Sequence, residues 1–147
     1  MLNFRDIPVG EVSIIKGLWE KNRKYHEDIS EYFGDLYSDL VFEDRMNPFS
    51  SFDREHIKIT VVEDADMMLG YSISTFEEDE GCIHSLHVAE GVRGTGIGKS
   101  LMNSHISWLK KSGCKNISIT VAVENKNTIQ FYKKLGFKSN TLEMRLN

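Results

Sequence analysis

The chain has 147 residues, the length of one ordinary domain, and has no room for a second compact core. With 40% hydrophobic and 27% charged residues, only 11 glycines and 2 prolines, its composition excludes a disordered or fibrous protein and predicts one soluble domain over 1–147. No apolar run approaches the ~18 residues of a membrane span, the first residues resemble no export signal, and two cysteines are too few for a disulfide framework, so we expect a cytoplasmic protein with reduced thiols.

The net charge of −4 is distributed unevenly along the chain. Residues 1–90 carry 20 of the 22 acidic and 8 of the 18 basic side chains, a net of −12, whereas residues 91–147 carry a net of +8. A basic C-terminal part can hold an anion, and an acidic N-terminal part can attract a cation. A pI near 5.7, without a Lys/Arg stripe interleaved with aromatic residues, argues against nucleic acid as a partner.

The first part of the chain is predicted to form a strand and two helices. Leu2 to Asp6 has the pattern of a short strand, and helical spacing follows from about Pro8 to Tyr25. A second helix is predicted from Ser30 to Val41, and Met46 to Phe52 is predicted to be a loop.

The middle of the chain changes to the two-residue period of strands and predicts an antiparallel meander. Its three segments are His56–Glu63, Met67–Phe76 and Cys82–Val88. In the third, Ile83 lies on one parity and Leu86 and Val88 lie on the other, as a β-bulge would cause. Such a bulge would splay this strand from its neighbour.

The last part alternates helices and strands. The predicted elements are a helix from Gly98 to the cap Gly113, a strand over Asn116–Val123, a helix from about Asn125 or Thr128 to Gly136 and a closing strand over Phe137–Leu146. Strand, helix and strand in succession require a parallel crossover, so the sheet should be mixed and the class α/β or α+β.

The segment from Val88 to Lys99 joins a strand end, a glycine-rich turn and a helix start. Glycines let the backbone approach a phosphate closely, and the N-terminus of the helix contributes a partial positive charge. Arg93 and Lys99 would add full charges. We therefore expect an anion cradle formed by Arg93, Gly94, Thr95, Gly96, Ile97, Gly98, Lys99 and Ser100.

Two known phosphate-binding templates fit this segment poorly. The dinucleotide fingerprint GxGxxG requires a glycine where Lys99 stands, and no acidic residue near 115–120 is available for a ribose. The P-loop GxxxxGK[ST] fits Gly98-Lys99-Ser100, yet its first glycine would fall on Arg93. Only 47 residues follow Ser100, too few for the parallel strands of that fold, and a P-loop-like nucleotide-binding protein is therefore the less favoured alternative.

Two motifs resemble those of the GNAT superfamily of acyl-CoA-dependent N-acetyltransferases. The family's Arg/Gln-x-x-Gly-x-Gly/Ala pattern stands here as Arg93-Gly94-Thr95-Gly96-Ile97-Gly98, after the strand Ile83–Val88. Its downstream Asn, Tyr and Leu-Gly-Phe stand as Asn125, Tyr132 and Leu135-Gly136-Phe137. The resemblance implies a mixed, mostly antiparallel sheet that is flanked by helices and splayed at the bulged, cofactor-binding strand.

The resemblance also implies acetyl-CoA as cofactor and coenzyme A as product. Residues 93–99 would hold the pyrophosphate, and the strand residues Leu86, His87 and Val88 would pair with the pantetheine. The Val88 N–H would polarise the thioester carbonyl. Asn125 would bond the pantetheine arm, and Tyr132 would protonate the departing thiolate as general acid.

Direct attack by a neutral amine in a ternary complex requires a base. We predict His84, because histidine titrates near the working pH, with His87 and Glu124 as alternatives. No metal is expected, because a regular strand would point His84 and His87 to opposite faces.

The amine acceptor is the least specified part of the prediction. In the family the first two helices line the acceptor site, and here they and their connection are acidic, which suits a small cationic amine or a peptide amino terminus. The acidic residues are Glu27, Asp28, Glu31, Asp35, Asp39, Glu43 and Asp44. A non-catalytic acyl-CoA-binding module is the alternative, no membrane partner is expected, and a homodimer, common in the family, is left open.

Overall fold

The computed structural model describes residues 1–147 and divides into two compact units. The first unit comprises residues 1–22 and 41–120, and the second comprises residues 23–40 and 121–147. Helix α1 (Lys16–Ile29) begins in the first unit and ends in the second. None of the helices combines the length and the apolar character that crossing a bilayer requires.

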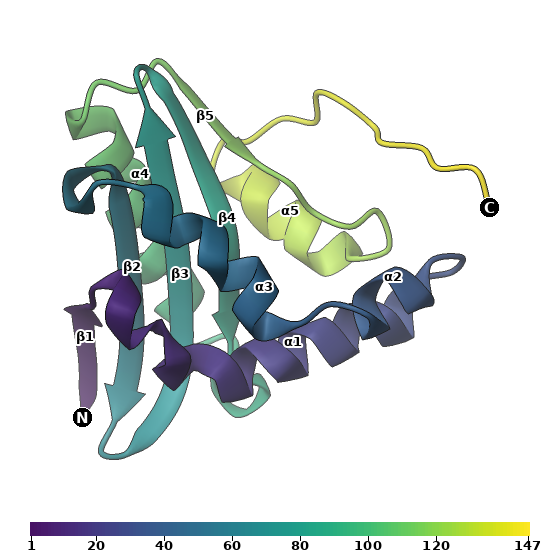
Figure 1. Ribbon diagram of the computed structural model, residues 1–147, viewed down its shortest axis with the longest axis horizontal. Helices are drawn as coiled ribbons and strands as arrows, with labels where there is room; N and C mark the ends of the chain where they lie inside the picture. Colours follow the sequence, from purple (N-terminus) through teal and green to yellow (C-terminus); the bar gives the residue numbers. More distant parts are fainter. The chain divides into compact units, whose positions relative to one another are not determined.

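The first unit contains a five-stranded sheet in which spatial order follows chain order (Figure 1). The strands are β1 (Leu2–Asp6), β2 (Ile57–Asp64), β3 (Met67–Glu77), β4 (Glu80–Val88) and β5 (Asn116–Ile119). The first four pair antiparallel, and β5 pairs parallel with β4. The prediction of a mixed, mostly antiparallel sheet is therefore confirmed.

Helices lie on both faces of this sheet (Figure 1). Helix α4 (Ile97–Lys111) packs on one face, against β2, β3 and β4. The opposite face carries α3 (Phe42–Met46) and the 3₁₀ segments η1 (Val9–Ile15), η2 (Asn47–Ser51) and η3 (Arg54–His56). A further 3₁₀ turn, η4 (Glu90–Val92), follows β4.

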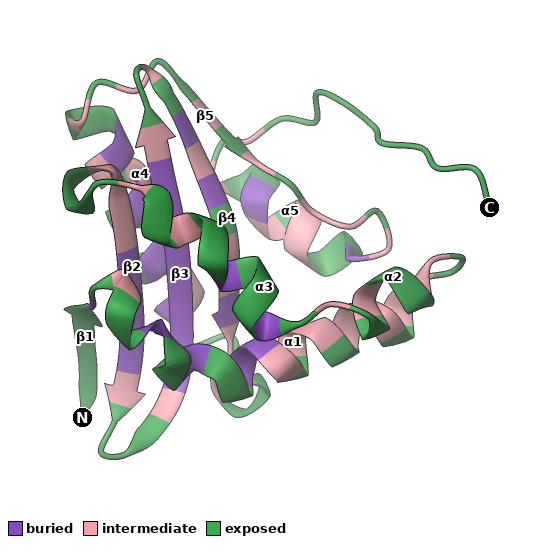
Figure 2. Ribbon diagram, viewed as in Figure 1, coloured by how far each residue is buried: buried purple, intermediate pink, exposed green.

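The core between α4 and the sheet is apolar at the start of the helix. Val62, Leu69, Ile97 and Leu101 are buried together, and Figure 2 shows the buried positions concentrated on the central strands. Partly buried Leu86, Val88 and Val92 pack against this cluster. Each such aliphatic side chain contributes roughly 1.5–3 kcal/mol when fully removed from water, so this cluster holds the start of α4 on the sheet.

One turn further along α4, the fully buried His105 is held by hydroxyl groups. Its Nε2 lies 2.8 Å from Thr60 Oγ1 and its Nδ1 lies 2.6 Å from Ser74 Oγ. The Thr60 hydroxyl donates to Asp6 Oδ1 at 2.6 Å, so Nε2–H donates to Thr60 and Nδ1 accepts from Ser74. Burial lowers the pKa of His105 to about 3, in keeping with this neutral arrangement.

The predicted β-bulge is present, and His84 is the extra residue. Ser85 pairs with Ile73 and Ile83 pairs with Ser74, so His84 has no partner on β3. Residues directly opposite one another in a sheet point to the same face. Because the bulge adds one residue to β4, Leu86 and Val88 point to the same face as Ile83. Ile83, Leu86 and Val88 all face α4 as a result.

Several element boundaries differ from the prediction. The helix predicted over 30–41 is only α2 (Gly34–Ser38), because Tyr32, Leu36 and Val41 are exposed and provide no apolar face for a longer helix. The segment predicted as a loop over 46–52 is mostly 3₁₀ helix. The strand predicted over 116–123 ends at residue 119.

The second unit contains α2, the end of α1 and helix α5 (Lys126–Lys134). The closing strand predicted over Phe137–Leu146 is wrong. The Phe137 N–H donates to the Tyr132 carbonyl at 3.1 Å, and residues 138–147 are exposed and pair with no strand. Alternating apolar residues form a strand only where a neighbour accepts their backbone hydrogen bonds, and this segment has none.

Candidate active site

The candidate site in the first unit begins where β4 loses its neighbour. The β4–β5 pairing ends at Ile83 and Ile119, whereas β4 continues to Val88. This edge of β4 has no strand partner beyond Ile83. The sheet is thus splayed on the C-terminal side of the bulge, as predicted.

Hydrogen-bond phase decides which backbone groups this free edge presents. The Ala89 N–H donates to the Leu69 carbonyl at 2.8 Å, so Val88, opposite Gly70, belongs to the next, non-hydrogen-bonded pair. Its N–H and C=O therefore point away from β3, toward the free edge. Leu86, two residues earlier in the same register, has the same orientation. The predicted role of the Val88 N–H as a donor is compatible with this geometry.

The glycine-rich turn lies between Val88 and α4. Gly94 and Gly96 have φ values of +82° and +91°, which residues with a side chain adopt only with strain. A Cβ built at either position would meet nothing within 4 Å, so space is open in front of the turn. Gly96 is the N-cap of α4, whose first N–H groups point out of the helix and favour an anion. These features fit a pyrophosphate group.

The side chains of this turn contribute differently. Arg93 Nε donates to the Val88 carbonyl at 3.2 Å, which ties the turn to the end of β4, and the Thr95 hydroxyl donates to the Val92 carbonyl at 2.5 Å. Lys99 is exposed. The Ser100 N–H is already bonded to the Gly96 carbonyl at 3.0 Å, so its backbone is not available to a phosphate.

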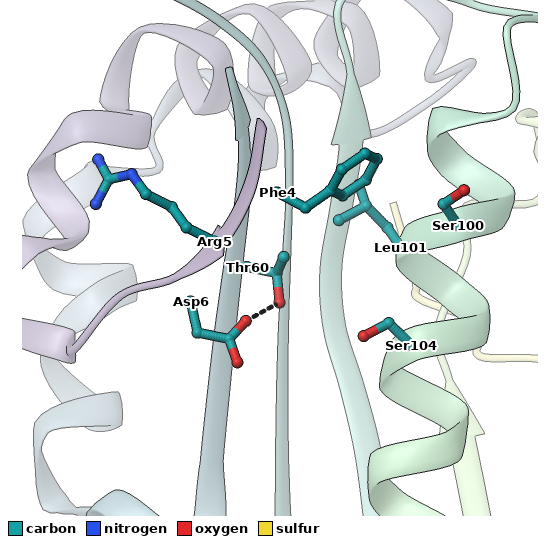
Figure 3. Close-up of a pocket in the computed structure, with 7 residues that line it drawn as sticks. All are labelled: Phe4, Arg5, Asp6, Thr60, Ser100, Leu101 and Ser104. Atoms are coloured by element: carbon teal, nitrogen blue, oxygen red, sulfur yellow. Dashed lines mark hydrogen bonds between the residues drawn. The ribbon is translucent and has the colours of Figure 1, made fainter. Parts of the chain in front are cut away.

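Ser100 instead lines a cavity of about 510 Å³ between α4 and strands β1 and β2. The other lining residues are Phe4, Arg5, Asp6, Thr60, Leu101 and Ser104. In Figure 3 the Arg5 side chain extends away from the side on which Ser100 and Ser104 lie. Ser100 is the only predicted site residue in this cavity, which therefore lies outside the candidate site.

His84, at the bulge, lies on the face opposite α4. Its Nε2 is 2.6 Å from Thr75 Oγ1, and its Nδ1 is 3.7 Å from Cys82 Sγ. Phe49 of η2 contacts the imidazole edge to face, with ring centroids 5.0 Å apart. Burial, together with the positive charge of Arg45, lowers the pKa of His84 and keeps the ring neutral near pH 7.

The bulge also changes the expected relation between the two histidines of β4. His87 is buried opposite Tyr71, on the same face as Thr75 and therefore as His84. The prediction that these two histidines point to opposite faces is wrong, because the bulge makes the strand irregular between them. No group of three or more His, Cys, Asp or Glu side chains is placed to hold a metal ion.

The remaining predicted site residues, Asn125 and Tyr132, lie in the second unit. Asn125 precedes α5 and is buried, and its Oδ1 accepts a hydrogen bond from the Tyr25 hydroxyl at 3.3 Å. That bond fixes the amide and leaves its NH₂ group for another acceptor.

Tyr132 lies inside α5 and is 7% exposed. Its ring packs near Phe131 and Phe137, with centroids 5.5 and 6.0 Å away. Burial raises the pKa of Tyr132 to about 12, so the phenol holds its proton at any working pH. Its hydroxyl has no hydrogen-bond partner within the chain.

The acidic residues predicted to attract a cationic acceptor are partly neutralised. Glu27 pairs with Arg23 at 2.9 Å and with Lys24 at 3.2 Å, and Lys24 also lies 3.1 Å from Asp28. Glu43 pairs with Lys16 at 2.7 Å. Such pairs contribute little to stability, but they cancel local charge. The structural support for a cationic acceptor is correspondingly weaker.

The structure thus brings together Leu86, Val88 and the glycine turn in the first unit, and Asn125 with Tyr132 in the second. Sequence reasoning missed the partners of His84, namely Thr75, Cys82 and Phe49. These come from three separate segments, and no spacing in the chain signals their contact.

Comparisons with known proteins identify related sequences and folds. A model of the acetyltransferase (GNAT) family matches residues 20–137. An uncharacterized N-acetyltransferase from Methanocaldococcus jannaschii is 45% identical over 67 residues, 45% of this chain and 30% of that protein. The matched part is thus less than a third of the relative's length.

Solved structures resemble the whole chain. A tetramutant of a Bacillus halodurans protein superposes with a TM-score of 0.80 at 20% identity, over 99% of both chains. A putative acetyl transferase from Pyrococcus furiosus gives 0.76 at 21% identity, over 100% of this chain and 99% of the other. Identities this low establish a common fold and no more.

Proposed function

The chain belongs to the acetyltransferase (GNAT) family, whose model covers residues 20–137, and from this premise we propose that it transfers an acetyl group from acetyl-CoA to a primary amine of a small molecule or peptide. The observation that supports this most directly is the free edge of β4, which leads within a few residues into the glycine turn. A strand edge offers hydrogen bonds to an amide chain, and the turn offers N–H groups to phosphates.

The chain's own residues suit the parts of coenzyme A. Gly94 to Lys99 would hold the pyrophosphate, and the backbone groups of Leu86 and Val88 would pair with the pantetheine amides. The free amide N–H of Asn125 would donate to the same arm. When bound, acetyl-CoA would supply the acetyl group as an activated thioester, and the Val88 N–H is oriented to donate a hydrogen bond to its carbonyl oxygen.

His84 is proposed as the base that accepts the amine proton. The Thr75 hydroxyl at 2.6 Å accepts from Nε2–H in the tautomer that leaves the lone pair on Nδ1. Only the weak Cys82 contact at 3.7 Å occupies Nδ1, so this nitrogen is the one that takes up a proton. The lowered pKa of His84 keeps that lone pair free near neutral pH.

Tyr132 is proposed as the proton donor to the departing sulfur. Its raised pKa, about 12, ensures that Oη carries a proton. A thiol has a pKa near 8.5, so complete transfer from this phenol to a thiolate is uphill in the isolated groups. Tyr132 therefore acts chiefly as a hydrogen-bond donor that stabilises the thiolate as it forms.

Thermal stabilisation tests the proposed cofactor. A ligand that binds only the folded state raises the melting temperature, so acetyl-CoA and coenzyme A are each expected to raise Tm by several degrees at 100-fold excess over Kd. ATP with magnesium serves as the comparison ligand. Stabilisation by ATP and magnesium alone would refute the proposal and favour the P-loop alternative, although the mostly antiparallel sheet argues against that fold.

Turnover separates an enzyme from a silent acyl-CoA-binding module. Release of coenzyme A with an amine present supports the transferase, whereas binding without release from a broad amine panel favours the module. A cytoplasmic location is proposed on the two free thiols, Cys82 and Cys114.

A further inference from the structure

A positively charged residue lies beside the proposed base. The backbone is helical without interruption from Phe42 to Ser51, through α3 and η2. Phe42 and Met46 are buried on one side of this run. Arg45 and Phe49, each three residues further on, form the adjacent stripe. Because Phe49 contacts His84, this stripe places Arg45 on the side of the run that faces the base.

The electrostatics of the site agree with this placement. The charge of Arg45 acts on His84 and lowers its pKa. Arg45 is exposed and forms no ion pair, whereas Lys16, Lys24 and Lys58 are each paired with a carboxylate. An unpaired guanidinium is therefore present on the helical run that contacts the proposed base.

This arrangement disfavours a polyamine and favours an acceptor with a carboxylate. A second ammonium group on the acceptor would meet Arg45 as a like charge. A carboxylate would instead find a planar pair of donors that matches its geometry. No carboxylate of the chain contacts His84 or Arg45 to offset that preference.

We propose that Arg45 binds a carboxylate of the acceptor, and that the acceptor is a zwitterion of the amino-acid type, in which the reacting amine and the carboxylate are only a few bonds apart. The inference rests on the proposed acetyl transfer and specifies its acceptor class. Arg45 is then a specificity-determining residue, and His84 is the base that receives the proton of the same amine. Phe49 supplies an apolar surface against the imidazole of His84.

The test compares matched acceptors. Glutamate, lysine, phenylalanine and threonine are each assayed for coenzyme A release beside the corresponding carboxamide and the decarboxylated amine. In at least one set we expect kcat/KM for the acid to exceed that of its two derivatives about tenfold or more. Arg45→Gln should reduce this preference to less than threefold, and Arg45→Lys should retain part of it.

A matched variant and a binding control keep the outcomes separate. Arg54→Gln removes the same charge from the exposed η3 segment and should leave the preference unchanged. Stabilisation by acetyl-CoA should persist in Arg45→Gln. If decarboxylated amines react as well as the acids, or if Arg45→Gln preserves the preference, the carboxylate inference is wrong while acetyl transfer stands. Failure of every acid to react overturns it too, and failure of acetyl-CoA to bind overturns both proposals.

Discussion

Tyr132 combines a buried ring with a hydroxyl that no group of the chain engages. Removing only that hydroxyl, as in Tyr132→Phe, should lower kcat about 10²-fold, because a positioned hydrogen-bond donor that stabilises the leaving thiolate in the transition state contributes effects of that order. The apparent Kd for coenzyme A should change less than threefold, since the ring remains in place. Steady-state kinetics together with thermal shifts distinguish the two effects.

Tyr32→Phe is the matched control, because it removes the same hydroxyl from a side chain that is 63% exposed. Its kcat should equal that of the unchanged protein. An unaltered kcat in Tyr132→Phe would remove this residue from the mechanism.

At the scale of residues, the sequence predicts which residues belong to the site better than it predicts the side chains that contact them. His84 could be selected because imidazole titrates near neutral pH, and Asn125 and Tyr132 because they stand at the positions of a motif. The groups that set the behaviour of His84 could not be predicted. Thr75 reaches it across a strand pair, and Phe49 reaches it from a segment that appeared to be a loop.

At the scale of elements, the glycine turn gives a sharp expectation. Gly96→Asp puts a strained side chain and a negative charge at the N-cap of α4, where an anion is expected to bind. Stabilisation by coenzyme A should be lost, with Kd raised at least 100-fold. Thermal shifts across a coenzyme A titration measure this.

Gly113→Asp provides the comparison for backbone strain. Gly113 follows the other end of the same helix with a φ of +92°, almost identical to that of Gly96. Both variants should lose Tm without ligand, but only Gly96→Asp should lose the response to coenzyme A. Equal responses in the two variants would show that the turn does not hold the phosphates.

Element prediction succeeded where burial sets the pattern. The β-bulge could be read from the sequence because Ile83, Leu86 and Val88 must all face α4, and only an extra residue brings them into phase. Prediction failed where apolar residues are exposed. Tyr32, Leu36 and Leu142 resemble the faces of a helix and a strand, yet the fold leaves them in solvent, and sequence alone does not show which faces find a partner.

For the whole molecule, the buried His105 makes the free energy of unfolding depend on pH. The folded state keeps this ring neutral to about pH 3, whereas the unfolded chain takes up a proton below about pH 6.5. Between these values the unfolded state binds more protons, so the free energy of unfolding should fall as pH falls, by about 2–3 kcal/mol at pH 4 relative to pH 7. Urea titrations at the two pH values measure the difference.

His105→Gln keeps a donor and an acceptor but does not titrate, so part of that difference should disappear. His56→Gln removes an imidazole outside the network and should leave the difference unchanged. Asp6 contributes in the same direction. Burial would raise its pKa, but hydrogen bonds from Lys58 and Thr60 outweigh burial and hold the pKa low. If His105→Gln loses as much stability in acid as the unchanged protein, the network does not control acid unfolding.

The global architecture was the most predictable level. A meander followed by a strand-helix-strand crossover restricts the sheet to few arrangements, and two motifs name the family. The acceptor was the least predictable, because the sequence does not show which acidic side chains form ion pairs within the fold, as Glu27 does with Arg23.

The single extra residue His84 determines to which face of the sheet each later residue of β4 points. If His84 were instead paired within the ladder, opposite Ile73, Leu86 would lie opposite Tyr71 and His87 opposite Gly70. The apolar side chain would then leave the α4 core, and the imidazole would enter it beside Ile97 and Leu101. Loss of the bulge with His84 retained would therefore turn every later side chain of β4 to the other face of the sheet, whereas deletion of His84 itself would leave the remaining pairs unchanged.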